Sequence, residues 1–144
     1  FTFKDLNEQK LSINFHEFLL IIESQNRNER DQHWRNQSDF LHYEKYDDYF
    51  SLEQFSEAIN SLKNKGLIVQ DTRNIIKHDI SSLKRVDGDF STVKDVELKK
   101  IKDDGYAPNY KSMFGNSEIE LVQDIYNDDL ELYKSHFGDK NLLF

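Results

Sequence analysis

The sequence predicts a mainly α-helical protein with one or two short strands. Apolar residues recur at helical spacing in several segments, and three of these segments begin with the residue pattern of a capping box. A single proline and five glycines leave few positions that force a helix to stop. Because the sequence contains no long linker, we expect residues 1–144 to form a single helical unit.

The first helix is predicted over residues 15–24. Asn14 and Glu17 have the spacing of a capping box, with Asn14 as the N-cap. The polar residues 25–36 that follow are expected to form an irregular connection. The apolar side chains that share one face of this helix, and should therefore be buried, are Phe15, Phe18, Leu19 and Ile22.

A second helix is predicted over residues 52–64. Ser51 and Gln54 give the second capping-box pattern, and Gly66 readily adopts the left-handed conformation that ends many helices. The apolar stripe of this helix consists of Leu52, Phe55, Ile59 and Leu62.

Two short strands are predicted on either side of this second helix. Residues 46–50 contain the aromatic side chains typical of a strand, although two aspartates weaken the pattern. Residues 67–69 are consecutive apolar residues, which indicate a short strand or an extended arm. Because two short strands do not form a stable sheet alone, we expect them to pair with strands from elsewhere.

A third helix is predicted to begin near Ser91 or Thr92 and to end before Gly105. Residues 104–108 should then form a turn, because Pro108 restricts the backbone of the residue before it.

The last predicted helix covers residues 118–136 and is the longest. Ser117 and Glu120 give the third capping-box pattern. The apolar residues that continue at helical spacing over more than four turns are Ile119, Val122, Ile125, Tyr126, Leu130 and Tyr133.

The composition excludes several classes of function. The formal net charge of −8 argues against broad binding to nucleic acid or to anionic membranes. The absence of cysteine excludes disulfides, thiolate metal sites and cysteine nucleophiles. No run approaches the roughly 20 apolar residues of a membrane-spanning helix, and no signal-peptide pattern is present. The sequence contains neither a calcium-loop pattern nor a His-Glu-x-x-His pattern, so we predict no bound metal ion.

Residues 30–37 are the most informative stretch of the sequence. They contain the only tryptophan, Trp34, together with a histidine, two arginines and several side-chain amides. A buried helix or strand rarely accommodates so many polar groups, because each needs a partner once it leaves water. The mixture predicts a loop that folds back onto a core and presents polar groups to a ligand or to the rest of the protein.

The sequence around this stretch resembles the carbohydrate sulfotransferases of the Golgi type and their bacterial relatives. Residues 33–37 (His-Trp-Arg-Asn-Gln) are similar to the His-Trp-x-Pro-Gln element of that family. Residues 15–18 resemble the Phe-x-x-Phe helix that precedes this element, and residues 46–53 resemble a segment in which a strand ends at a glutamate. Residues 125–133 resemble the closing helix of the family. The four segments occur in the order and at the spacing expected of the family. The resemblance covers nearly the whole chain.

The sequence departs from the family pattern at several points. Asn36 stands where the family has proline, and Phe50 stands where a glycine is usual. The cysteines of animal members are absent, which indicates a microbial member. The sequence also lacks a glycine-rich loop opening a helix, which such enzymes use to bind the sulfate donor. Because the first residue is Phe1 rather than methionine, we expect the chain to be a processed or truncated piece of something longer.

The resemblance therefore implies the C-terminal part of an α/β P-loop-type sulfotransferase domain. Such an enzyme transfers a sulfuryl group from 3′-phosphoadenosine 5′-phosphosulfate to a carbohydrate hydroxyl. The expected partners are a carbohydrate acceptor and the N-terminal half of the same domain, which would bind most of the donor. The chain alone is expected to be inactive. The expected location is the cytoplasm in a bacterium, or the Golgi lumen in a eukaryote.

His33 is the candidate catalytic residue, because an imidazole near neutral pH can accept or donate a proton. The alternative is that it only forms hydrogen bonds within the loop. Arg35 could bind a planar anion on a glycan or form an ion pair with Asp31 or Asp39. The candidate substrate-binding residues are Arg30, His33, Trp34, Arg35, Gln37 and His78.

For several other candidate residues, we expect a structural role rather than a functional one. Trp34 is expected to anchor the core rather than to serve as a sugar platform, and Gln37 is expected to hold the loop. Glu53 is expected to interact favourably with the dipole of the helix that it begins. A different class of function, a non-enzymatic helical protein-binding module, remains an alternative, with the acidic last helix and exposed aromatic residues as the partner surface.

Overall fold

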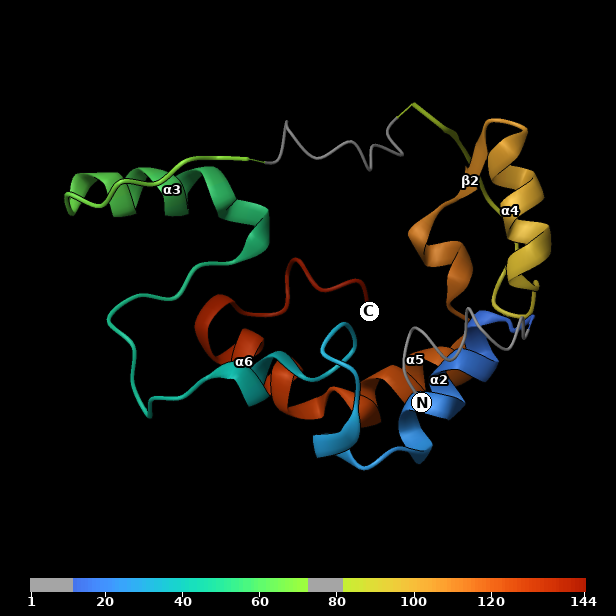
Figure 1. Cartoon of the computed structure of the whole chain (residues 1–144), viewed down its shortest axis with the longest axis horizontal. Coiled ribbons are helices and arrows are strands. Elements are labelled where there is room, and N and C mark those ends of the chain that lie inside the picture. The colour runs from blue at the N-terminus through green and yellow to red at the C-terminus, as the bar shows by residue number, and fades with distance from the viewer. Residues whose placement is uncertain (1–11, 73–81) are drawn as a thin grey trace.

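The computed structural model describes residues 12–72 and 82–144 and confirms a mainly helical protein with a small parallel sheet (Figure 1). Among the described residues, no helix has both the length and the apolar character needed to span a membrane. The helices, short 3₁₀ turns and strands are, in chain order, α2 (Phe15–Ser24), η1 (Arg27–Glu29), η2 (Gln37–Phe40), η3 (Leu52–Gln54), α3 (Phe55–Asn64), β1 (Lys84–Val86), α4 (Asp95–Asp103), β2 (Tyr106–Pro108), η4 (Tyr110–Met113), α5 (Asn116–Ile125) and α6 (Asn127–Phe137).

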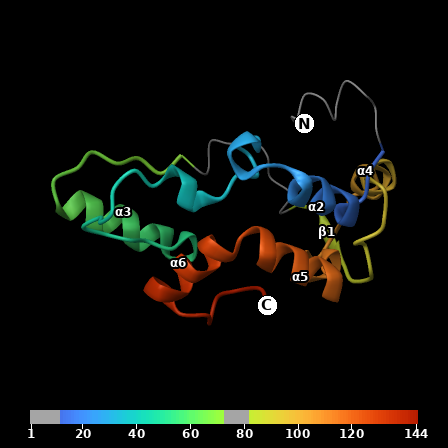
Figure 2. The same cartoon turned by 90° about the horizontal axis from the view of Figure 1, so that it is seen from below.

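The core lies where α2 packs against α5, and the two helices lie side by side in both views (Figures 1 and 2). Its buried apolar side chains come from α2, from the following loop and from α5. Burying one such side chain stabilises a fold by about 1.5–3 kcal/mol, so this cluster is the main apolar contribution in the described part. The residues of the cluster are Leu19, Ile22, Trp34 and Ile125, with Phe15, Phe18, Leu121, Val122 and Tyr126 packed around them.

The predicted first helix is confirmed, as is its capping box. The Asn14 Oδ1 atom accepts a hydrogen bond from the Glu17 backbone N–H at 2.8 Å. The Glu17 carboxylate in turn accepts from the Asn14 backbone N–H at 2.9 Å. Lys94 contacts the same carboxylate at 2.6 Å, which links the start of α2 to the segment before α4.

The predicted second helix is also confirmed, but its start differs. Residues 52–54 form a 3₁₀ turn before α3 begins, and Ser51 caps neither element with its side chain. Gly66 has a φ of +82°, as expected for the residue that ends a helix. α3 and α4 lie at opposite ends of the molecule (Figures 1 and 2).

The strand predicted over residues 46–50 is wrong, because these residues form no strand. Residues 67–69 form no strand either, which leaves the extended arm as the remaining alternative for them. The strands are instead β1 and β2, which pair in parallel with Arg85 opposite Ala107. Parallel strands need a long crossover, and α4 supplies it within residues 87–105. Three-residue strands are too short for a period-two pattern to be visible in the sequence.

The predicted turn at residues 104–108 is correct only at its beginning. Gly105 turns with a φ of +88°, but residues 106–108 then continue as β2. Pro108 fits there because both strands of a two-stranded sheet are edge strands, and the hydrogen bond to the Val86 carbonyl comes from the Asn109 N–H rather than from the proline nitrogen. The preceding helix α4 begins at Asp95 rather than near Ser91, whose hydroxyl and backbone N–H both donate to the Asp89 carboxylate.

The predicted long C-terminal helix is two helices rather than one. α5 and α6 meet at Tyr126, whose φ of −114° and ψ of 24° interrupt the helical backbone. The third capping box is also shifted along the chain. Glu118, not Glu120, closes it by accepting from the Gly115 backbone N–H at 2.8 Å, and Ser117 donates to the same carboxylate.

Candidate functional site

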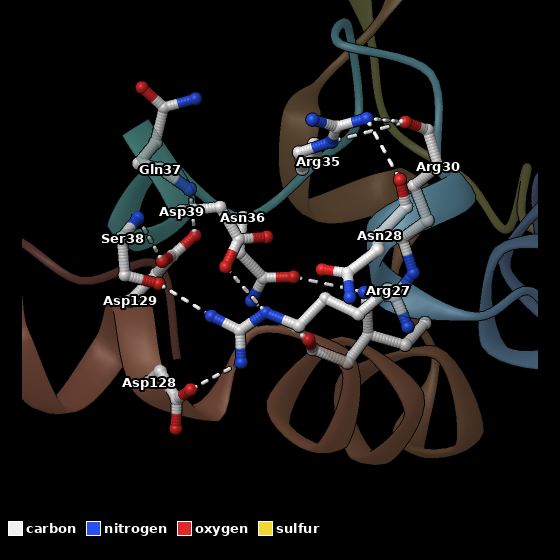
Figure 3. Close-up of polar contacts among 11 residues, drawn as sticks. Arg27, Asn28, Arg30, Arg35, Asn36, Gln37, Ser38, Asp39, Asp128 and Asp129 are labelled. Atoms are coloured by element: carbon white, nitrogen blue, oxygen red, sulfur yellow. Dashed lines mark hydrogen bonds and ion pairs between the residues drawn. The ribbon is translucent and has the colours of Figure 1, made fainter. Parts of the chain in front are cut away.

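The candidate site is the loop of residues 25–40, which lies between α2 and α6 and contains the two short turns η1 and η2 (Figure 3). Most of the side chains predicted to bind a ligand belong to this loop. The structure divides them into an inner group that holds the loop and an outer group at the surface. His78 lies outside the described residues.

Trp34 belongs to the inner group. Its side chain is part of the core and only 8% exposed. The indole packs edge-on against the Phe18 ring, with 5.4 Å between centroids and an interplanar angle of 86°. The Trp34 carbonyl accepts from the Tyr126 hydroxyl at 2.8 Å. These contacts favour the anchoring role over a sugar platform.

Arg30 and Asn36 are buried together beneath the loop. The Arg30 Nη1 atom donates to the Asn36 Oδ1 atom at 2.9 Å. The Asn36 Nδ2 atom donates to the Ile125 carbonyl, at the end of α5, at 3.1 Å. Asn36 is only 1% exposed, so this one side chain connects the buried guanidinium to the helix end. Among the described residues, the buried Arg30 Nε atom has no hydrogen-bond partner.

Arg35 is half-buried and directed at backbone. Its Nη2 atom donates to the Arg30 carbonyl at 2.8 Å and to the Asn28 carbonyl at 3.2 Å (Figure 3). Its guanidinium lies 5.9 Å from the centroid of the Phe40 ring, which is within reach of a cation–π interaction. Within the described part of the chain, the ion pair that we considered with Asp31 or Asp39 is not formed.

Arg27, which is not among the predicted site residues, makes the ion pairs instead. Its Nε atom donates to Asp39 at 2.8 Å, its Nη1 atom to Asp128, and its Nη2 atom to the Ser38 hydroxyl. The hydrogen bond with Asp128 is the main reason why the pKa of Arg27 lies above its usual value. The residue therefore joins the loop to α6.

Gln37 is exposed and begins η2. Its backbone N–H donates to the Asp129 carboxylate at 2.8 Å, and the Ser38 N–H donates to the other oxygen at 2.9 Å. Asp129 thus supplies acceptors to the N–H groups that a short helical turn leaves unpaired at its start. The side-chain amide of Gln37 points away from Asp129 (Figure 3).

His33 belongs to the outer group. Its side chain is 64% exposed, and its Nδ1 atom lies 2.6 Å from the Asp31 Oδ1 atom. The same carboxylate oxygen accepts from the His33 backbone N–H at 3.0 Å. A carboxylate on one ring nitrogen orients an imidazole so that its other nitrogen can exchange a proton. The same contacts also form an ordinary loop turn, as the structural alternative expected.

An apolar groove of about 390 Å³, which was not predicted, has Gln37 among its lining residues. It lies between residues 41–52 and α6. The signal that could have indicated it is the spacing of Leu130, Tyr133 and Phe137, which places three apolar side chains on one face of α6. No group of acidic residues and histidines that could hold a metal ion occurs in the described ranges.

Comparison of the chain with protein-family models, with curated proteins and with solved structures finds no match.

Proposed function

We propose that the chain is the C-terminal portion of a sulfotransferase, which transfers a sulfuryl group from 3′-phosphoadenosine 5′-phosphosulfate to a carbohydrate hydroxyl. The observation that carries the proposal is that the four segments of the sequence resemblance contact one another. The fourth segment lies far along the sequence from the other three, so its contacts with the second and third are expected if the segments are parts of one unit of structure. The contacts are those of Phe18 with Trp34, Asn36 with Ile125, Trp34 with Tyr126, and Glu53 with Tyr133.

The backbone at Asn36 supports the same proposal, although this residue stands where the family has proline. Its φ of −54° and ψ of 136° lie within the range that a proline ring permits. The asparagine therefore leaves the backbone in a conformation that a proline at this position would also permit.

The chemistry assigned to this chain is on the acceptor side. In sulfuryl transfer, the bond from sulfur to the acceptor oxygen forms while the bond from sulfur to the donor's phosphate oxygen breaks. The acceptor hydroxyl loses its proton, and we assign the His33 imidazole as the base that receives it. Asp31 holds the imidazole ring in place. The exposed side-chain amide of Gln37 supplies a second contact with the acceptor carbohydrate.

In this proposal, the sulfate donor binds to residues outside the loop of residues 25–40. The negative charge on the transferring group calls for cations and aimed N–H groups. Arg27, Arg30 and Arg35 each donate to groups of the chain itself. Arg30 and Trp34 accordingly position the loop in this proposal.

The test is a transfer assay on the complete polypeptide in which these 144 residues occur. Labelled sulfonate from the donor is offered to a panel of oligosaccharides, and binding of adenosine 3′,5′-bisphosphate is measured by calorimetry. We expect transfer, and we expect His33→Ala to lower kcat by about 10²–10⁴-fold with little change in KM. The matched control is His42→Ala, since His42 is also an exposed loop histidine. Absence of both nucleotide binding and transfer, or an equal effect of the two substitutions, would reject the proposal.

The alternative, a non-enzymatic helical protein-binding module, is favoured by one observation, the apolar groove beside α6. A complete polypeptide that binds no nucleotide and transfers no sulfonate, but binds a protein through this groove, would support the module instead.

A further inference from the structure

The apolar groove is formed where residues 49–52 pass across α6. Tyr49 stacks on His136 with 3.7 Å between ring centroids and an interplanar angle of 15°, which holds this segment against the helix. Leu52 remains 76% exposed although it lines the groove. The other apolar side chains that line it include Leu41, Phe50, Leu130, Tyr133 and Phe137.

A polar hollow of about 550 Å³ continues from the groove. The two cavities share His136 and Phe137, so they form one surface with an apolar part and a polar part. The polar part carries one carboxylate, one ammonium group and two side-chain amides, supplied by Glu53, Lys140, Gln54 and Asn141.

We propose that this combined surface binds an uncharged amphiphile, with an alkyl chain in the apolar groove and a sugar headgroup in the polar hollow. The lining of the groove is mostly apolar and offers few hydrogen bonds to replace those of water, so an apolar group gains most by entering it. The polar part offers both donors and acceptors, which is what the hydroxyls of a sugar require.

The charges around the surface select an uncharged headgroup. Glu53 and Lys140 contribute one charge of each sign to the hollow, and Asp129 adds a negative charge at the groove. The Glu53 carboxylate is held in place by the Tyr133 hydroxyl at 2.9 Å. Two negative charges against one positive charge leave a net negative charge on the lining, which repels an anionic headgroup and does not repel a neutral sugar.

The groove also reaches the candidate site, because Gln37 lines it. The assignment of the amphiphile as the acceptor of sulfonate, and hence of a glycolipid as the substrate class, rests on the proposed function. Binding of the amphiphile does not.

The test is an NMR titration of the 144-residue chain with octyl glucoside, glucose and octyl sulfate, each below its critical micelle concentration. Octyl glucoside should give saturable shifts at Leu130 and Asn141, in the two parts of the surface. Glucose should bind much more weakly, and octyl sulfate should bind more weakly than the glucoside. Glu53→Gln should reduce the difference in Kd between octyl glucoside and octyl sulfate.

A pair of matched substitutions separates the groove from general apolar binding. Leu52→Lys should raise the Kd for octyl glucoside about tenfold, as expected when a leucine contact is lost. Leu67→Lys changes a leucine that is also exposed but lies outside both cavities, and it should leave the Kd unchanged.

Three results would overturn the proposal: no saturable shift, equal effects of the two substitutions, or octyl sulfate binding as tightly as octyl glucoside. Binding without sulfonate transfer by the complete polypeptide would reject the sulfotransferase and leave the amphiphile site. Transfer to a soluble oligosaccharide without amphiphile binding would do the reverse.

Discussion

Replacement of Asn36 by alanine is expected to destabilise the protein more than any exposed substitution in the same loop. The Asn36 side chain is 1% exposed and makes two hydrogen bonds in opposite directions. Its carbonyl oxygen accepts from Arg30, and its amide donates to the Ile125 carbonyl. Alanine removes the acceptor and the donor of Asn36 at once, so Arg30 and the Ile125 carbonyl both lose a hydrogen bond.

The size of the effect follows from what remains buried. The Arg30 guanidinium loses its Asn36 acceptor while its Nε atom already lacks a partner among the described residues. A buried group left unpaired costs about 1–3 kcal/mol, and a hydrogen bond to a charged group contributes about 1.5–3 kcal/mol. Allowing for partial rehydration of the site, we expect Asn36→Ala to lower the free energy of unfolding by about 3 kcal/mol. This is a large share of the roughly 5–15 kcal/mol typical of a domain.

The assay is urea denaturation followed by tryptophan fluorescence. Trp34 is the only tryptophan of the chain and lies two residues from the substitution in a buried position. With a typical m-value of about 2 kcal/mol/M, a loss of about 3 kcal/mol lowers the urea midpoint by roughly 1.5 M. The corresponding fall in Tm is about 6–12 °C.

The matched control is Asn28→Ala, because Asn28 is an exposed asparagine in the same loop. It should change the free energy of unfolding by less than about 0.5 kcal/mol. A loss of less than about 1 kcal/mol for Asn36→Ala, at an unchanged m-value, would refute the reasoning that Asn36 holds the loop to α5.

Three further predictions concern other parts of the structure. Burial raises the pKa of Glu118, but hydrogen bonds from Ser117, His16 and the Gly115 N–H lower it more, so its folded-state pKa lies below the ordinary value of 4.5. The stability that Glu118 contributes is therefore complete above about pH 4.5 and is lost as the pH falls through the folded-state pKa; denaturation at a series of pH values should show the gap between wild type and Glu118→Gln closing in acid, and a constant gap would contradict this. Gly138, which ends α6 with a φ of +73° and a ψ of −170°, occupies a region that only glycine adopts readily, so Gly138→Ala should cost about 1–3 kcal/mol in the same denaturation assay, and an unchanged midpoint would show that the turn relaxes without strain. The pKa of Glu53 is lowered by its own backbone N–H and then by the Tyr133 hydroxyl, so an NMR titration of Tyr133→Phe should show this pKa rising toward its ordinary value, and no movement would mean that the hydroxyl does not bind there in solution.

The sequence predicted the helices whose signals are local. The helix over residues 15–24 has a capping box at its start and apolar residues on one face, and both features act within a few residues. The second helix ends near Gly66 for the same reason. Neighbouring positions suffice to specify such elements, so no knowledge of tertiary contacts was needed.

The errors occurred where a distant residue decides the local structure. The predicted long helix is interrupted at Tyr126, and Asn36, 89 residues before Ile125, donates to the carbonyl at that point. The two strands each span three residues and are specified by their pairing across α4 rather than by alternation. Apolar periodicity contains no information about either contact.

The sequence predicted that the candidate site is a loop, but it did not predict which way each side chain of the loop points. Its composition showed that many polar groups needed partners, and the structure supplies them from α5, α6 and the loop backbone. Arg30 and Arg35 bond to other residues of the loop, and these bonds depend on how the loop folds back on itself. Composition does not specify that fold, so sequence reasoning could not separate the two arginines from the exposed His33.

The inner and outer groups of the loop are connected through the backbone of Trp34. An exposed histidine can direct proton transfer only if the chain beneath it is held, because its ring otherwise samples many orientations. Trp34, the residue after His33, packs against the Phe18 ring and accepts a hydrogen bond from the Tyr126 hydroxyl. Asp31, two residues before His33, contacts the imidazole itself. The buried contacts of Trp34 and Asn36 therefore fix the position of the backbone from which the His33 side chain extends into solvent. Substitutions that loosen these contacts should disturb the orientation of His33 as well as the stability of the fold.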